Sequence, residues 1–182
     1  ESGKDVMILL DGITRLTRAY AEILSQGFSG SEPLGLHLEG PFINREKKGA
    51  FNPSWIRPAS LQEAQDFLEA GRGWVRQMTL APELPQATEI ARLFRQNGVV
   101  VALGHSNADY ACAAEALKGD FVHVTHTFNA QSSFDHRSPG VFGAILGSDH
   151  VTAELIADGY HVHPGAMKVL IRCLGTERVV LI

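Results

Sequence analysis

The sequence predicts an α/β protein built on one parallel sheet, and two observations favour this fold class. Strand-like runs of apolar and β-branched residues alternate with segments of helical, amphipathic spacing from one end of the chain to the other. No internal repeat or low-complexity linker interrupts the alternation. Because strand–helix–strand units of this kind form parallel sheets with right-handed crossovers, a single continuous sheet is expected.

Taken in order, the chain should begin with an amphipathic helix over residues 12–26, which Gly27 ends. Further helices are expected over residues 60–70, 86–96, 108–117 and 164–174. Ser60 should cap the second helix and Asn107 the fourth. The expected strands are residues 34–40, 74–80, 99–103, 121–127, 151–157 and 178–182. Two long loops, after Pro41 and after the fourth strand, separate these elements.

A (β/α)8 barrel of the TIM type is the architecture that this order favours. Such a barrel has eight strands and about 250 residues, whereas this chain has 182 residues and about six expected strands. We therefore interpret residues 1–182 as one catalytic barrel domain, present as an incomplete barrel. A doubly wound open sheet is the alternative, and it is less favoured because no glycine-rich phosphate-binding sequence follows the first strand.

Composition and charge exclude several function classes. A formal net charge of -4 offers no basic surface for nucleic acid or for an anionic membrane. No apolar run reaches the length of a transmembrane helix, and the start of the chain lacks a signal-peptide pattern. Cys112 and Cys173 have no metal-binding or disulfide spacing. The expectation is a soluble, cytoplasmic protein.

Three polar residues stand where predicted strands end. Glu39, His105 and His126 each follow a run of strand residues, and the histidines continue faces whose earlier members are apolar. In a parallel barrel the carboxyl ends of the strands meet at one rim, where reactive groups lie. One carboxylate and two imidazoles suit Zn²⁺ or a similar ion, with a position left for water. The alternative is two structural histidines and a solvated carboxylate. His37, one layer below Glu39, is expected to be a packed core residue.

An ordered set of motifs resembles the N-acetylglucosamine-6-phosphate deacetylase family of the amidohydrolase superfamily. The motifs are HLEGPF (37–42), TLAPE (79–83), GHS (104–106), THTFNA (125–130), HRSPG (136–140) and AELIADGYHVHP (153–164). The resemblance implies a (β/α)8 barrel with a small β-sandwich formed by the two chain ends. The first strands, the end of the barrel and that sandwich are therefore expected outside residues 1–182.

The resemblance also implies roles for particular residues. Glu39, His105 and His126 match the family's metal ligands. The resemblance implies a zinc ion, with iron, manganese or cobalt as alternatives. Each subunit would bind one or two ions. The residues expected to bind an amino-sugar phosphate are Asn129, Ala130, Arg137, Asp158 and His161. Arg137 matches an arginine that grips the phosphate, in the family often across a homodimer.

The implied reaction is hydrolysis of the acetamide of N-acetylglucosamine 6-phosphate to glucosamine 6-phosphate and acetate. Metal-activated water would attack the acetyl carbonyl, and an aspartate would move the proton to the departing amine. That aspartate is expected immediately after Ile182, so no catalytic acid or base is assigned within the chain.

Two features leave other functions open: the catalytic aspartate is expected outside residues 1–182, and the residue at position 51 departs from the family's pattern. Phe51 occupies a position where many members of the family have a histidine that contacts substrate. A catalytically weakened sugar-phosphate binding protein is therefore one alternative, and an amidohydrolase acting on a different amide is another. Glu83 is a further rim residue to which the sequence assigns no role.

Overall fold

The computed structural model describes residues 13–27 and 30–182. The α-helices are α1 (Ile13–Ser25), α2 (Leu61–Gly71), α3 (Ala87–Gln96), α4 (Tyr110–Lys118), α5 (Gly140–Leu146) and α6 (Pro164–Leu174). The strands are β1 (Leu36–Glu39), β2 (Val75–Leu80), β3 (Val100–Leu103), β4 (His123–Val124), β5 (Thr152–Leu155) and β6 (Val179–Leu181). Three short 3-10 turns are η1 (Arg45–Lys47), η2 (Pro53–Trp55) and η3 (Thr176–Arg178). Gly12, the first residue of the first predicted helix, lies outside the described residues.

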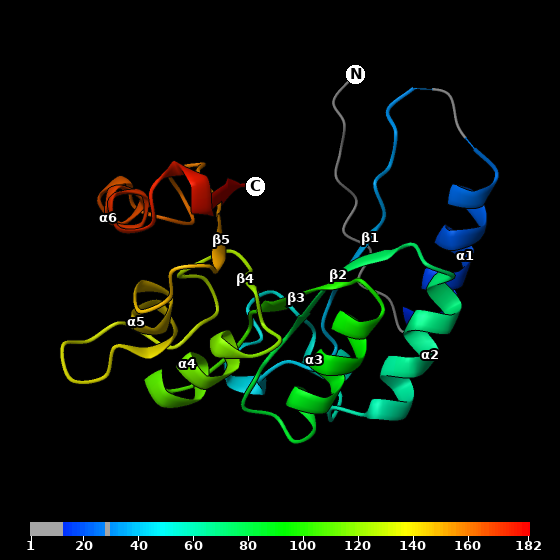
Figure 1. Cartoon of the computed structure of the whole chain (residues 1–182), viewed down its shortest axis with the longest axis horizontal. Coiled ribbons are helices and arrows are strands. Elements are labelled where there is room, and N and C mark those ends of the chain that lie inside the picture. Colours follow the sequence, from blue (N-terminus) through cyan, green and yellow to red (C-terminus); the bar gives the residue numbers. More distant parts are fainter. Residues whose placement is uncertain (1–12, 28–29) are drawn as a thin grey trace.

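The six strands form one parallel sheet in the order of the sequence, β1 to β6. Elements that follow one another in sequence therefore lie side by side, with α1 to α3 at one side of Figure 1 and α4 to α6 at the other. A doubly wound sheet would reverse its strand order at a switch point, and no reversal occurs. The predicted α/β class and its incomplete, six-stranded barrel are confirmed.

One face of the sheet is apolar and packs against the helices. Leu38, Met78 and Val101 lie in register on neighbouring strands of this face. They are buried together with side chains from the helices, such as Phe67 of α2 and Phe94 of α3. Burial of this continuous apolar layer between sheet and helices is the main stabilising contribution to the fold.

The opposite face of the sheet carries polar side chains that hydrogen-bond to one another. The hydroxyls of Thr79 and Thr125 lie 2.7 Å apart, and the Nε2 atom of His37 lies 2.7 Å from the Thr79 hydroxyl. His37 is nevertheless exposed, so the predicted packed core histidine is wrong. It lies on β1, an edge strand of the sheet, and no further described strand pairs with the free edge of β1.

The sequence missed one helix, α5, inside the second long loop. Its seven residues include two glycines, and six of the seven are buried. A segment that is apolar on all sides has no amphipathic period, so the pattern that revealed the other helices is absent here.

The start of α4 also differs from the prediction. Asp109, and not Asn107, is the N-cap, because its side chain accepts a hydrogen bond from the backbone N–H of Cys112. Asn107 instead donates its side-chain amide to Glu46. The cap of α2 is as predicted, since the Ser60 hydroxyl accepts from the Glu63 N–H. None of the helices in the described part of the chain is long and apolar enough to cross a membrane.

Candidate metal centre

The structure brings Glu39, His105 and His126 together at the carboxyl ends of three strands. The Nε2 atoms of His105 and His126 lie 2.8 Å and 2.9 Å from Glu39 Oε1. The two Nε2 atoms are 3.1 Å apart. His105 and His126 lie 66 and 87 positions from Glu39 along the chain. The three residues nevertheless present one oxygen and two nitrogens to a single point.

The histidines reach this point by a route that strand alternation does not predict. Leu103 and Val124 lie in register on the apolar, helix-covered face, whereas Glu39 belongs to the polar face with Thr79. Simple alternation would therefore direct His105 away from Glu39. Instead the backbone of His105 has φ 48° and that of His126 has φ 32°. These left-handed turns end the strands and direct both imidazoles towards Glu39.

The carbonyl of Lys47 fixes the orientation of the His105 ring. It lies 2.8 Å from His105 Nδ1, and because a carbonyl only accepts, Nδ1 must carry the proton. In the neutral ring Nε2 then has a free lone pair, which is the form that binds a metal. Lys47 belongs to the loop after β1, so this loop orients a candidate ligand that follows β3. No feature of the sequence indicates this backbone acceptor.

Glu83 connects the loops on either side of His105. Its carboxylate accepts hydrogen bonds from the Asn44 side chain, the Ser106 hydroxyl and the Asn107 backbone N–H, at 2.9, 2.7 and 2.6 Å. Asn44 in turn donates its backbone N–H to the carbonyl of His105. Glu83 therefore ties the loop after β1 to the turn that carries His105.

Phe51 lies beside the same imidazole. Its ring is 5% exposed and meets the ring of His105 edge to face, with centroids 5.0 Å apart. Ile43 and Ile56 complete a small apolar cluster with it. Apolar side chains therefore line this side of the centre.

The charges at the centre are arranged to favour a cation. Burial raises the pKa of Glu39, but the close approach of the His105 and His126 imidazoles lowers it more, and the net pKa lies far below the usual range. Burial likewise lowers the pKa of His126, yet the hydrogen bond and charge of Glu39 raise it above the ordinary 6.5. The carboxylate is therefore ionised and attracts positive charge.

The donor set fits a divalent ion such as zinc. Tetrahedral zinc with bonds of about 2.0–2.1 Å would separate its ligand atoms by about 3.3 Å, and the observed separations of 2.8 to 3.1 Å are only slightly shorter. Shifts of a few tenths of an ångström in the side chains would bring the three ligand atoms to these distances. Three protein ligands would leave one position of the ion for water.

The residues expected to bind substrate fall into two groups. Asn129 and Ala130 lie in the turn after His126, and the Ala130 carbonyl accepts the Ser106 N–H, next to the other histidine. Arg137, Asp158 and His161 are exposed on the loops after β4 and β5. Asp158 pairs with His161 Nδ1 at 2.7 Å, and hydrogen bonds from the backbone and ring of His161 lower the pKa of Asp158 to about 2. No hydrogen bond or ion pair joins these three residues to the candidate metal ligands within the described part of the chain.

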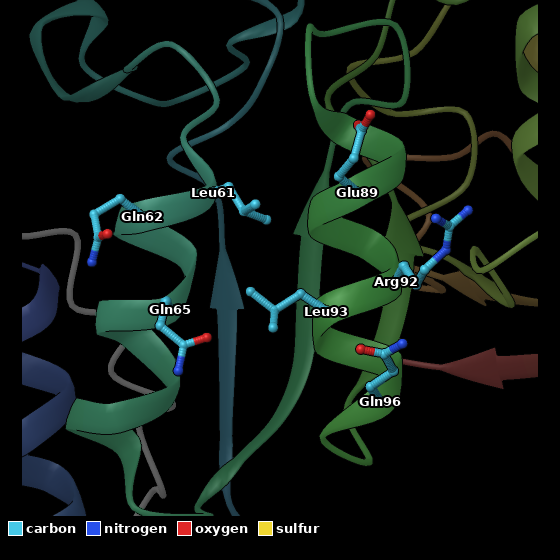
Figure 2. A pocket seen from close by; sticks show the side chains of 7 residues that line it. All are labelled: Leu61, Gln62, Gln65, Glu89, Arg92, Leu93 and Gln96. Atoms are coloured by element: carbon cyan, nitrogen blue, oxygen red, sulfur yellow. The ribbon is translucent and has the colours of Figure 1, made fainter.

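A separate groove lies on the outer surface between α2 and α3. Figure 2 shows Leu61 of α2 and Leu93 of α3 pointing into this groove. Glu89 and Arg92 also lie on α3. None of the three candidate ligands lines this groove. It is therefore distinct from the candidate metal centre.

Comparison with known proteins explains the arrangement of motifs. No family model matches the sequence. The N-acetylglucosamine-6-phosphate deacetylase of Bacillus subtilis is 40% identical over 153 residues, which are 84% of this chain and 39% of that protein. The N-acetylgalactosamine-6-phosphate deacetylase of Escherichia coli O157:H7 is 35% identical over 173 residues, 95% of this chain and 46% of that protein.

Solved structures agree with the sequence comparison. The crystal structure of N-acetyl-D-glucosamine-6-phosphate deacetylase from Mycobacterium smegmatis superposes with a TM-score of 0.88 at 34% identity, over 93% of this chain and 44% of that one. A mutant of that enzyme in complex with N-acetyl-D-glucosamine-6-phosphate superposes equally well. The chain is a relative of the N-acetylglucosamine-6-phosphate deacetylases. The resemblance inferred from the sequence motifs is confirmed, and the chain spans less than half the length of these deacetylases.

Proposed function

We propose that the protein hydrolyses the N-acetyl group of N-acetylglucosamine 6-phosphate, releasing glucosamine 6-phosphate and acetate. The observation that carries this proposal is the convergence of Glu39, His105 and His126, within 2.8 to 3.1 Å of one another, in a chain related to deacetylases. In this proposal the three residues hold a divalent ion, with zinc as the first choice because two imidazoles and a carboxylate suit it.

The chain's own residues prepare the site for such an ion. Glu39, ionised because of its low pKa, supplies the negative charge that compensates the cation. His105 is held by the Lys47 carbonyl with its Nε2 lone pair facing Glu39. An ion bound there would polarise the acetyl carbonyl and lower the pKa of water. The half-buried position of Glu39 and His126 restricts access of bulk water to the reacting amide.

Asn129, Ala130, Arg137, Asp158 and His161 are proposed to bind the sugar phosphate. Asn129 and Ala130 adjoin His126, so they are placed to contact the part of the substrate near the amide. Arg137 is exposed on a loop, where a guanidinium can reach a phosphate by two parallel hydrogen bonds. We further propose a cytoplasmic homodimer in which Arg137 serves the partner subunit's site.

An acetate-release assay tests the function. The full-length protein loaded with zinc should release acetate from N-acetylglucosamine 6-phosphate and far more slowly from the unphosphorylated sugar. Arg137→Ala should raise KM for the phosphorylated sugar by roughly tenfold or more, because a charge-assisted bidentate contact contributes about 1.5–3 kcal/mol, and should leave the unphosphorylated sugar unaffected.

Arg95→Ala is the matched control, since Arg95 is an exposed arginine on α3 in the outer helix layer. It should change neither KM nor kcat. Equal loss with both sugars in Arg137→Ala would show that this arginine does not bind the phosphate. Absence of acetate release from any phosphorylated amino sugar would reject the deacetylase itself.

A second candidate is a sugar-phosphate binding protein with little turnover. The buried ring of Phe51 favours it, because it covers the His105 side of the centre with a group that cannot hydrogen-bond to a substrate carbonyl or hydroxyl. In that case the protein would bind the phosphorylated sugar in a calorimetric titration without releasing acetate.

A further inference from the structure

Glu154 is a buried carboxylate whose place in the fold is not explained by the metal ligands themselves. It lies on β5 between Ala153 and Leu155, which belong to the apolar face, so its own side chain points to the polar face of the sheet. Only 6% of the residue is exposed. A buried charge is costly unless it is fully hydrogen-bonded, so its partners indicate what it stabilises.

Three donors surround this carboxylate. The side-chain amide of Gln77 donates to Oε1 at 2.9 Å, and Nε2 of His123 lies 3.0 Å from the same oxygen. The other oxygen, Oε2, accepts the backbone N–H of His126 at 3.1 Å. In addition, the main-chain carbonyl of Glu154 accepts the N–H of Thr127 at 2.8 Å. One residue thus binds two consecutive backbone N–H groups, those of His126 and of the residue that follows it.

These bonds act where the backbone is strained. His126 has φ 32°, in the left-handed region that is unfavourable for a residue with a side chain, at a cost of about 1–3 kcal/mol. Such a conformation persists when the surroundings hold it. The turn is also what directs the imidazole to Glu39. No other side-chain acceptor holds the His126 N–H in the described part of the chain.

We propose that Glu154 is a positioning residue for the metal centre: it fixes the turn at His126 so that this imidazole meets Glu39 and His105 at one point. The proposal deepens the proposed function, because it depends on these three residues binding an ion. Glu154 makes no hydrogen bond to the side chains of the three candidate ligands in the described part of the chain, and it acts through the backbone N–H groups of His126 and Thr127.

A purely structural role is the competing explanation, since Glu154 also neighbours His123. The matched control for that role is Thr152→Val. The Thr152 hydroxyl hydrogen-bonds to the other ring nitrogen of His123, and Thr152 makes no hydrogen bond to His126 in the described part of the chain. This variant disturbs the same polar face of the sheet without touching the turn.

The experiment measures zinc affinity by competition with a chelator, in the full-length protein and in three variants. Glu154→Met removes both carboxylate oxygens and keeps the main-chain carbonyl. It should weaken zinc binding by about 10–100-fold, as loss of a ligand-orienting partner does in other metal sites. Glu154→Gln keeps one oxygen for the His126 N–H and should stay within a few-fold of the wild type. Thr152→Val should bind zinc like the wild type, whatever it does to thermal stability.

Cobalt substitution gives a second readout that does not depend on activity. The visible absorption of the cobalt-loaded protein should change in Glu154→Met and be restored in Glu154→Gln. Wild-type affinity in Glu154→Met, or equal weakening in Thr152→Val, would overturn the positioning role while the metal centre stands. A wild-type protein that binds no zinc would overturn the metal centre and this proposal together. If Glu154→Met does not fold, Glu154→Ala, which also lacks an acceptor for the His126 N–H, takes its place, and the same zinc affinities decide.

Discussion

At the scale of single residues, two histidines depend on their backbone conformation more than on their strands. The sequence pointed to His105 and His126 as candidate ligands because both follow the last residues of a strand. Its reason, a shared face with the preceding apolar residues, was wrong, since those residues face the helices. Positive φ angles turn both imidazoles to the opposite face. Neither residue is glycine, and although histidine is more common at positive φ than most residues, this is only a weak local signal for such turns.

Glu154 and Glu83, two carboxylates that hold the backbone next to the candidate ligands, show what can and cannot be predicted from sequence patterns. Glu154 interrupts an apolar strand, and an acid between Ala153 and Leu155 is a signal that could have been noticed. Glu83 stood out in the sequence only as a possible rim residue without a role, and its three donors come from two distant loops. Partners brought together only by the fold cannot be deduced from spacing.

The raised pKa of His126 predicts how zinc affinity depends on pH. The ion binds the neutral imidazole, so protons compete with it. Because the pKa of His126 lies above 6.5, the competition begins at a higher pH than for an ordinary histidine. Glu39 remains ionised throughout, since its pKa is lowered far below 4.5. Affinity should therefore fall by about tenfold per pH unit below the His126 pKa.

Zinc dissociation constants measured between about pH 5.5 and about pH 8.5 check this expectation. Affinity that is constant down to the acidic end of that range would contradict a binding role for His126.

At the scale of elements, helix starts were predictable wherever a capping side chain stands next to an amphipathic run. Ser60 is such a case, and α2 begins where the sequence indicated. Two capping residues compete before α4, and the structure selects Asp109 because Asn107 is used to bridge Glu46 and Glu83. Helix α5 escaped prediction because burial on all sides removes its period.

The two caps can be distinguished by substitution. Asp109→Ala should destabilise the protein by about 1 kcal/mol, because the Cys112 N–H loses its acceptor. Asn107→Ala should cost less, about 0.5 kcal/mol, since only an exposed side-chain hydrogen bond is lost and the backbone bond to Glu83 remains. Chemical unfolding of the two variants measures both values. A larger effect for Asn107→Ala would favour the cap that the sequence predicted.

At the scale of the whole molecule, the strand order explains why residues from distant segments meet. A parallel sheet that follows the sequence places all carboxyl ends of its strands at one edge. The alternation of strands and helices was sufficient to predict this arrangement and hence the edge at which Glu39 and the histidines lie. The loops that complete the site, from Asn44 to Phe51 and after His126, follow no period, and their contacts required the structure.

The central claim is that Glu39, His105 and His126 bind one divalent ion. A crystal structure of the full-length, zinc-loaded protein, with an anomalous difference map recorded at the zinc absorption edge, tests it most directly. We expect a peak about 2.0–2.2 Å from a Glu39 carboxylate oxygen and from the Nε2 atoms of both histidines. A fully loaded crystal with no peak among these three atoms would contradict the account.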